Sequence, residues 1–533
     1  MPADLGICSD VDERQGEARI MKQFGRWLAV IASILLAGCA TLPPLQGRVE
    51  SLALTDTSQT RLGTALAGDI KANPGKSGVH SLGDPRDAFA ARGLLARAAE
   101  KSIDAQYYIW HDDQAGQLLF ETLWNAAERG VRVRLLLDDN STRGLDAIIA
   151  TLDAHPNIEV RLYNPFPSRG ARAADFLSDF TRVNRRAHNK SFTVDNQASV
   201  IGGRNIGDEY FKLGSGLGFT DADVLVVGPI VREISDTFDR YWNSPSAYPA
   251  ASLVAPPAAD AVAVLKARFA AVNASPESVT YLDSLRATPL VTELVEHRID
   301  LEWTTMKLVV DDPAKTLDTT GRQDILLYPQ LLREAGRPQE TLDIVSPYFV
   351  PSDEGVNRLC ALAKGGVKVR ILTNSLAASD EYVVHSGYSP HRLKLVQAGV
   401  HLWELAPTVA KPLGEKAHIG SSSSSALHAK VFSADQRRTF VGSYNFDQRS
   451  AHLNTEQGLL IDSTALGRRL AQVMDADLPY AAYEVILAPD GHSLQWIERG
   501  AAGEVRYDVD PHTSWWLRAK VDMLSLLPID WLL

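Results

Sequence analysis

The sequence is poor in cysteine and lacks any excess of positive charge. Its 533 residues include three cysteines, Cys8, Cys39 and Cys360. This number excludes a fold stapled by disulfides, and we expect Cys360 to pack in a core. The formal net charge of −11 argues against binding of nucleic acid or anionic lipid through bulk charge. Any phosphate-binding site must therefore be local.

The N-terminal apolar run, residues 27–37, is shorter than the ~20 residues of a transmembrane helix. It follows two basic residues and precedes small residues, which is the pattern of a signal peptide. The LAGC stretch at Leu36–Cys39 resembles the lipobox of bacterial lipoproteins. We therefore predict that Cys39 is acylated and that the protein is lipid-anchored in a bacterial cell envelope, facing the periplasm. Residues 1–20 are acidic, which is unusual for a signal peptide and favours translation from Met21.

The length indicates more than one domain, because single hydrophobic cores stop growing at ~250–300 residues. Hydrophobic content of 45% and charged content of 22% are ordinary for a globular protein. We predict six segments: an N-terminal extension with signal peptide (1–39), a linker (40–80), a first α/β domain (81–250), a connector (251–335), a second α/β domain (336–490) and an aromatic, apolar C-terminal tail (491–533).

The two predicted domains are copies of one unit. SIDAQYYIWHDDQAG from Ser102 aligns without gaps with TLDIVSPYFVPSDEG from Thr341. Each stretch precedes an expected helix and a second strand, ERGVRVRLLLDD and KGGVKVRILTNS. Alternating strands and helices predict βαβ units, hence an α/β fold with a mainly parallel sheet in each half.

A polar motif also occurs once in each half. AHNKSFTVDNQASVIGGRN begins at Ala187, and LHAKVFSADQRRTFVGSYN begins at Leu427. Each has His, Lys two residues later, Asp five residues after the Lys, and Asn ten residues after the Asp. The residues are His188, Lys190, Asp195 and Asn205 in the first copy and His428, Lys430, Asp435 and Asn445 in the second. Two copies in register predict one pseudo-two-fold active site at the domain interface. The serine run at 421–425 is then a loop that leads into the second copy.

The residue types suit phosphodiester chemistry. Residues i and i+2 of a strand share a face, so each His lies beside its Lys. One His can attack phosphorus and form a phosphohistidine, while the other acts as general acid and base. Lysines and asparagine amides can neutralise the phosphate oxygens, so we predict no metal and no cofactor.

Other residues of the motifs are predicted to support this chemistry. Asp195 and Asp435 come at strand ends and are expected to brace their motifs. Gly203 and Ser443, next to the glycines Gly202 and Gly442, would let a phosphate approach the backbone. Each His also needs a group to orient it. The candidates on the following strands are Asp221 or Asp223 in the first half and Glu456 in the second.

These motifs resemble the phospholipase D superfamily, whose mark is a duplicated His-x-Lys-x4-Asp with a downstream Gly or Ser and Asn. HNKSFTVDNQASVIGGRNIGDEYF together with DDPAK at Asp311–Lys315 looks most like the bacterial cardiolipin synthase C type. The resemblance implies that His188 and His428 are the nucleophile and the acid/base, and that the lysines and asparagines bind phosphate. It favours His188 as the nucleophile, but the near symmetry of the motifs leaves that choice open.

The predicted function is transfer of a phosphatidyl group from one phospholipid to phosphatidylglycerol, which gives cardiolipin. The C-terminal tail fits a membrane surface as partner, since Trp515, Trp516 and Trp531 lie among leucines; docking of the tail on the protein core is the alternative. Water as acceptor would instead give phosphatidic acid. A metal-independent nuclease and a catalytically silent scaffold are weaker alternatives, and no protein partner is indicated.

Overall fold

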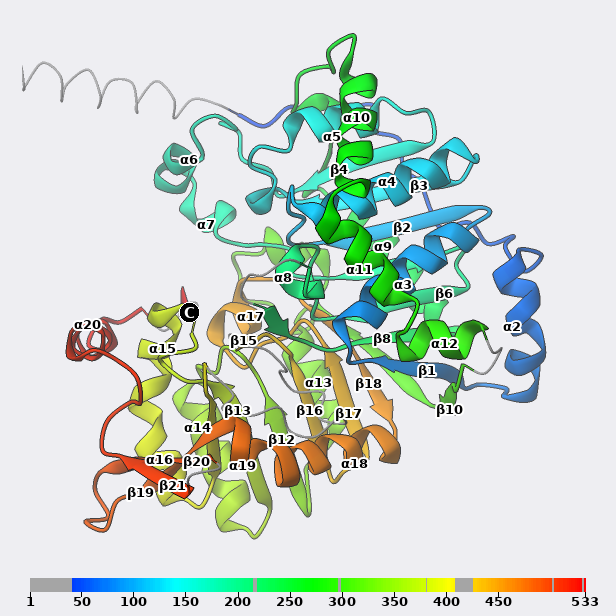
Figure 1. Ribbon diagram of the computed structural model, residues 1–533. Coiled ribbons are helices and arrows are strands. Elements are labelled where there is room, and N and C mark those ends of the chain that lie inside the picture. Colours follow the sequence, from blue (N-terminus) through cyan, green and yellow to red (C-terminus); the bar gives the residue numbers. More distant parts are fainter. Residues whose placement is uncertain are drawn as a thin grey trace, which may run out of the picture.

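The computed structural model describes residues 41–213, 218–295, 299–379, 381–407, 425–500, 503–529 and 532–533. The predicted signal peptide, Cys39, most of the serine run and Trp531 lie outside the described residues. The described chain forms two α/β halves that pack against each other (Figure 1).

The first half is built on a sheet that has nine strands in the described residues. Their order is β10 (Glu302–Thr304), β1 (Ser77–Leu82), β8 (Asp223–Val227), β6 (Ala198–Gly202), β5 (Ser191–Val194), β2 (Ser102–Tyr107), β3 (Arg132–Asp138), β4 (Ile158–Tyr163) and β9 (Ala247–Pro249). The helices of this half are α2 (Arg61–Ala72), α3 (Pro85–Ala98), α4 (Gln114–Glu128), α5 (Asp146–Asp153), α6 (Arg172–Ser178), α7 (Phe180–Val183), α8 (Asp208–Phe211), α9 (Pro229–Trp242), α10 (Ala261–Asn273), α11 (Pro276–Leu285) and α12 (Pro289–Val295).

The second half repeats the plan with ten strands among the described residues. Their order is β11 (Met306–Val310), β18 (Gln457–Asp462), β17 (Arg438–Gly442), β16 (Val431–Ala434), β12 (Thr341–Val345), β13 (Lys368–Asn374), β14 (His401–Leu405), β19 (Ala482–Leu487), β20 (Leu494–Gly500) and β21 (Gly503–Tyr507). Its helices are α13 (Leu327–Ala335), α14 (Asp353–Lys364), α15 (Tyr382–Tyr388), α16 (Arg392–Gln397), α17 (Gln448–His452), α18 (Thr464–Gln472), α19 (Leu478–Ala481) and α20 (Trp515–Ser525).

The expectation of mainly parallel sheets was wrong. Parallel pairing is confined to β2, β3 and β4 in the first sheet and to β12, β13 and β14 in the second. The strands of each polar motif, β5 with β6 and β16 with β17, are antiparallel hairpins added to the edge of this parallel unit. A tight turn can join only antiparallel strands, so the short link between the two strands of each motif already excluded a parallel pair.

The repeated sequences form matching elements for the same local reasons. Asp113 caps α4 by accepting from the Gly116 amide, and Ser352 caps α14 by accepting from Gly355. Each helix is followed by a glycine with positive φ, 91° at Gly130 and 93° at Gly366, which lets the chain turn back into the next strand. Strands β3 and β13 then run almost fully buried.

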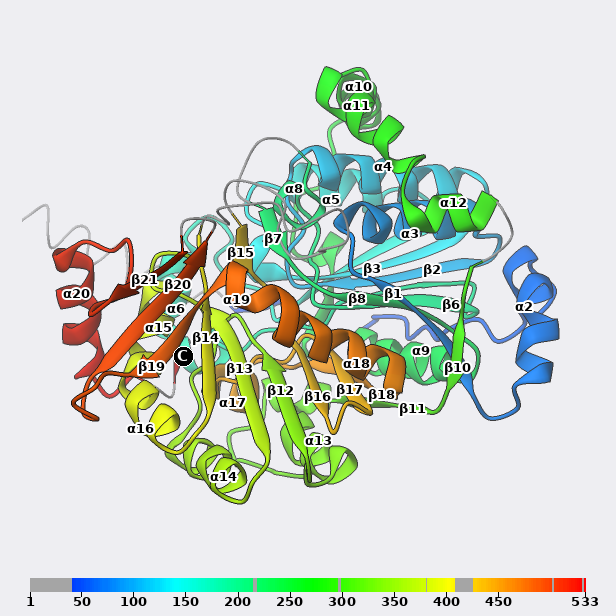
Figure 2. The same cartoon turned by 60° about the horizontal axis from the view of Figure 1, so that its bottom comes forward.

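A shared apolar core joins the halves. It contains Ile201 of β6 and Ile230 and Ile234 of α9, packed with Val441 of β17 and Leu459 of β18. Figure 2 shows α9 and α18 in the layer between the two sheets. The interface places the ends of β6 and β17, and therefore both polar motifs, next to each other.

The chain between the halves contributes to both sheets. Residues 302–304 form β10 on the edge of the first sheet, and residues 306–310 form β11 on the edge of the second. The predicted connector is thus part of the folded unit, while the exact domain limits stay a prediction. Among the described residues, the helices are too short or too polar to cross a bilayer.

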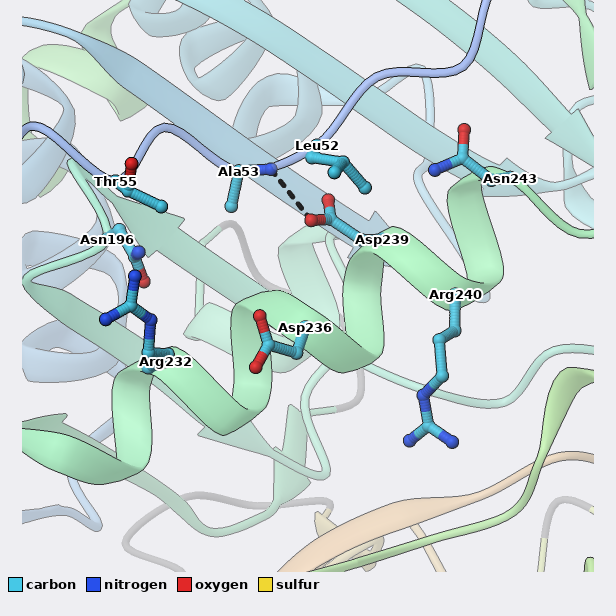
Figure 3. Close-up of a pocket in the computed structure, with 9 residues that line it drawn as sticks. All are labelled: Leu52, Ala53, Thr55, Asn196, Arg232, Asp236, Asp239, Arg240 and Asn243. Carbon is cyan, nitrogen blue, oxygen red and sulfur yellow. Dashed lines mark hydrogen bonds between the residues drawn. The ribbon is translucent and has the colours of Figure 1, made fainter.

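A surface hollow lies where the segment before α2 crosses α9 (Figure 3). The Ala53 amide donates to Asp239 Oδ2 at 2.7 Å, and Arg232, Asp236 and Arg240 line the hollow along the helix. The predicted catalytic residues do not line this hollow. It is a seam that fixes the N-terminal segment to the first half.

Candidate active site

The first histidine is held by the second half of the chain. His188 lies between α7 and β5, and its amide donates to Thr455 O at 2.8 Å. Its side-chain Nδ1 lies 2.9 Å from Glu456 Oε2 and 3.1 Å from Oε1. The orienting carboxylate is therefore Glu456, which is 268 residues away along the chain.

The second histidine mirrors this arrangement. His428 follows β15 (Ser425–Leu427), which pairs with β7 (Gly218–Thr220) of the first half. The His428 amide donates to Thr220 O at 2.8 Å, and its Nδ1 lies 2.6 Å from Asp221 Oδ2. Each histidine is thus oriented by a carboxylate from the other half, so neither half has a complete pair by itself.

The charge of the second histidine affects the ionisation of the first. Both side chains are buried, and burial lowers the pKa of each below the usual value. For His188 the lowering is large, and the positive charges of Lys190, Lys430 and His428 add to it. Lys190 and Lys430 also lower the pKa of His428. The same two lysines thus act on both histidines, and each histidine contacts a carboxylate of the opposite half, which indicates that the two motifs lie close together.

The two carboxylates have different ionisation. Burial alone would raise the pKa of Asp221, but the charges of His428, Lys430 and Arg204 bring it below the ordinary value. Burial raises the pKa of Glu456 to about 7, although Lys190 and hydrogen bonds oppose the rise. Asp221 is consequently a carboxylate at neutral pH, whereas Glu456 titrates near neutrality.

The predicted small residues make room for these carboxylates. A Cβ at Gly203 would lie 2.2 Å from Asp221 Oδ1, so only glycine permits that approach. In the second half, Ser443 donates through its hydroxyl to Glu456 Oε2, and the Gln457 amide donates back to Ser443 Oγ at 3.0 Å. Phosphate binding by Gly203 and Ser443 stays a prediction.

The lysines contact the histidine backbones, whereas the asparagines have other surroundings. Lys190 Nζ donates to His188 O at 2.5 Å, and Lys430 Nζ donates to His428 O. Asn205 accepts from the Ile109 amide at 3.1 Å through Oδ1 and donates to the Tyr210 hydroxyl at 3.0 Å. Asn445 Oδ1 is buried and has no hydrogen-bond partner among the described residues.

The remaining predicted residues lie outside this centre. Asp195 accepts from the amides of residues 100–102, and Asp435 accepts from those of residues 339–341. Asp223 pairs with Arg92 at 2.9 Å and Arg204 at 3.5 Å, so of the two first-half candidates Asp221 is the one that contacts a histidine.

Known proteins resemble this chain over most of its length. A family described as "Cardiolipin synthase, PLD-like domain" matches this chain twice, at residues 94–242 and 331–478. Cardiolipin synthase C of Escherichia coli (strain K12) is 44% identical over 478 residues, which are 89% of this chain and 100% of that protein. The chain belongs to the phospholipase D-like cardiolipin synthase family.

More distant relatives agree with this membership. An uncharacterised Helicobacter pylori protein is 30% identical and covers 89% of this chain and 93% of its own length. Cardiolipin synthase A of Pseudomonas syringae is 28% identical over 76% of this chain and 69% of its own. The solved phosphatidylserine synthase of Haemophilus influenzae has the same fold, with a TM-score of 0.51 and 13% identity over 76% of this chain and 90% of its own. The prediction of two phospholipase D-like α/β domains is confirmed.

This member of the cardiolipin synthase family has aromatic side chains at the site that sequence reasoning missed. The Tyr108 ring lies 5.0 Å from His188, and the rings of Tyr210 and Phe219 each lie 5.2 Å from His428. Tyr108 directly follows β2, the strand that pairs with β5, and this position was the available signal. Tyr210 and Phe219 are far from His428 in the sequence and approach it only in the folded chain, so no sequence pattern indicates this contact.

A histidine and two carboxylates gather beside α4. The possible ligand atoms of His111, Asp113 and Glu209 lie within 4.8 Å of one another. Glu209 raises the pKa of His111 through a 3.2 Å contact, and Asp113 caps α4. These roles in the protein account for all three residues, and metal-independent catalysis stays a prediction for this cardiolipin synthase homologue.

Proposed function

We propose that the protein is a membrane-anchored phosphatidyltransferase that forms cardiolipin from phosphatidylglycerol and a second phospholipid. The observation that carries the proposal is the exchange of carboxylates between the halves, with His188 bound to Glu456 and His428 bound to Asp221. Two oriented histidines at one buried, cationic site are what a two-step displacement at phosphorus needs. The relatives named as cardiolipin synthases support lipid phosphodiesters as the substrate class.

In the first step, His188 Nε2 attacks the phosphorus of the donor lipid. The depressed pKa of His188 favours the neutral imidazole that a nucleophile requires. The P–N bond forms as the bond to the headgroup oxygen breaks, and His428 gives its proton to that oxygen. Burial lowers the pKa of His428 as well, but the ionised Asp221 opposes this lowering and stabilises the imidazolium, which suits His428 to the role of general acid.

In the second step, the neutral His428 takes the proton from a glycerol hydroxyl of phosphatidylglycerol. That oxygen attacks phosphorus, the P–N bond breaks, and cardiolipin leaves. Lys190 and Lys430 each donate to a histidine carbonyl, and their positive charges can stabilise the phosphate oxygens. Asn445, with its unpaired buried amide oxygen, can accept a hydrogen bond from the incoming hydroxyl.

Membrane attachment forms part of the proposal. We infer an acyl anchor at Cys39, which would hold the protein on the periplasmic face of a membrane. The C-terminal helix α20 supports a second contact, because Trp515 and Trp516 are 58% and 70% exposed while Val521 is buried. The helix also touches the protein, with Lys520 Nζ 3.9 Å from the centroid of the Tyr382 ring. It is therefore docked on one side and apolar on the other, as an interfacial helix is.

Lipid analysis in a bacterial host without cardiolipin of its own tests the function. Expression of the wild type is expected to produce cardiolipin, and His188→Ala and His428→Ala are each expected to abolish it at equal protein level. Because each variant keeps the other histidine, loss in both shows that the two act together. Phosphatidic acid without cardiolipin would refute synthase action and establish hydrolysis.

A further inference from the structure

The chain between the halves carries a buried ion pair close to the active site. Asp311 directly follows β11, and Lys315 lies in the short 3₁₀ helix after it, Pro313–Thr316. Their side chains are 0% and 2% exposed, and Lys315 Nζ donates to Asp311 Oδ2 at 3.0 Å. A buried pair of this kind costs desolvation energy, so it is weak evidence for stability and invites a different explanation.

Both members of the pair act on the residue that orients His188. The Glu456 amide donates to Asp311 Oδ2 at 2.8 Å, and the Asp311 amide donates to Glu456 O at 3.0 Å. Lys315 Nζ also donates to Ser450 O at 2.9 Å, and the hydroxyl of Ser450 donates to Glu456 Oε1 at 2.9 Å. The pair therefore fixes the Glu456 backbone and the hydroxyl that binds its carboxylate.

Burial and the surrounding charges together set the ionisation of Glu456. His188 and Lys190 face it from the first half, Asp447 from the chain before α17, and Lys315 with Asp311 from the connecting chain. Burial raises the pKa of Glu456 to about 7, and the positive charges of Lys190 and Lys315 oppose the rise.

The ionisation of Glu456 in turn selects the tautomer of His188. An ionised Glu456 accepts the proton of Nδ1, which leaves the Nε2 lone pair free to attack phosphorus. A protonated Glu456 would donate to Nδ1, so the neutral imidazole would carry its proton on Nε2 and could not attack. We propose that Lys315 and Asp311 are positioning residues: both orient Glu456, and the charge of Lys315 favours the carboxylate form of Glu456, which keeps His188 in its nucleophilic tautomer. This inference rests on the proposed function of His188.

The pH dependence of kcat for Lys315→Met tests the proposal. Loss of the cation raises the pKa of Glu456, so the acid limb of the profile is expected to move to higher pH by about one unit. At pH 6 the variant would then be about tenfold slower than the wild type, with recovery near pH 9. Lys315→Arg, which keeps the charge, should stay close to the wild type. Lys307→Met on the exposed face of β11 is the matched control and should leave the profile unchanged.

The Asp311→Asn variant is expected to shift the acid limb of the kcat profile in the opposite direction. Removing the anion leaves the charge of Lys315 unopposed, so the acid limb should move to lower pH. If Lys315→Met does not fold, the profile of Asp311→Asn tests the proposal by itself. Acid limbs that stay in place while kcat falls evenly at all pH values would overturn the proposal, because a merely structural pair produces that pattern. Turnover is counted as cardiolipin plus phosphatidic acid, so a failure of the proposed acceptor stays distinguishable from a failure of this inference.

Discussion

The residues at positions 203 and 443 each accommodate a carboxylate that orients a histidine, but they do so with different side chains. In the first half, Gly203 leaves space for the short carboxylate of Asp221. In the second half, Ser443 instead offers a hydroxyl to the longer Glu456. The site is thus pseudo-symmetric in position and asymmetric in chemistry, which gives His188 and His428 different partners and different proposed roles.

Gly203→Ala is expected to impair catalysis without unfolding the protein. The added methyl would lie 2.2 Å from Asp221 Oδ1 and would push this carboxylate away from His428. We expect kcat to fall by about 10²-fold or more, since the general acid loses its orienting group. Steady-state kinetics together with a thermal unfolding curve measure both effects.

Gly93→Ala is the control for this substitution. Gly93 lies inside α3, and a Cβ there would meet nothing within 4 Å. It should leave kcat unchanged and stabilise the helix by about 0.5–1 kcal/mol. Normal turnover in Gly203→Ala would contradict the placement of Asp221 beside His428.

At this scale, the sequence predicted the histidines, lysines, asparagines and candidate orienting carboxylates, but not that each histidine pairs with the carboxylate of the other half. Both copies of the motif are visible in the sequence because each is local. The pairing of His188 with Glu456 and of His428 with Asp221 spans 268 and 207 residues and crosses from one half to the other. Such a contact follows from how the halves pack, and the sequence pattern left Asp221 and Asp223 as equal candidates.

At the scale of elements, each motif is a hairpin whose turn is fixed by its aspartate. Asp195 and Asn196 have φ of 51° and 50°, and Asp435 and Gln436 have φ of 53° and 50°. The carboxylate of Asp195 accepts from the amides that open β2, which ties the hairpin to the neighbouring strand. The prediction that these aspartates brace their motifs agrees with the contacts, and their effect on catalysis is open to test.

Asp195→Ala should reduce stability far more than catalysis. The substitution leaves three amides without their acceptor and puts alanine at positive φ, so we expect a loss of about 2–4 kcal/mol. Folded protein should keep kcat within about threefold of the wild type. Denaturant unfolding and the specific activity of the folded fraction are the measurements.

Asp236→Ala on the exposed face of α9 serves as the control and should change stability by less than about 0.5 kcal/mol. If Asp195→Ala instead kept its stability and lost its activity, the aspartate would belong to the substrate site.

The elements themselves were partly predictable. The βαβ order of each half followed from alternating strand and helix patterns, and it forms the parallel centre of each sheet. The antiparallel strands on either side come from long-range pairing. β1, for example, pairs with β8 and β10, and nothing in its own sequence identifies these neighbours.

At the scale of the whole molecule, the last residue of the chain is linked through Arg449 to the segment that precedes the first motif. The Arg449 amide, in α17, donates to Leu533 O at 2.7 Å, and the guanidinium of Arg449 donates to Asn184 O at 3.0 Å, four residues before His188. Figure 1 shows α20 on the same side of the molecule as α6 and α7. A membrane contact through α20 would therefore keep the active site near the bilayer.

Quenching of tryptophan fluorescence by brominated phospholipids tests that contact. Trp515 and Trp516 are expected to be quenched when the full chain binds vesicles, and a variant with both changed to Phe should lose this component. Other tryptophans and any acyl anchor are common to both proteins and cancel in the comparison. Val264→Ser on α10 is a control for loss of exposed apolar surface. Equal quenching in the wild type and the double variant would show that α20 does not touch the bilayer.

The sequence duplication predicted a two-fold molecule with a single active site. In that site, both histidines are expected to act on the same phosphorus atom. Trapping the phosphatidyl-histidine by alkaline quench, followed by peptide mass spectrometry, measures it most directly. We predict at most one phosphatidyl group per chain, on His188, and no adduct in His188→Ala. Two groups per chain, or adducts on His188 and His428 of the same molecule, would show two separate sites and contradict the account.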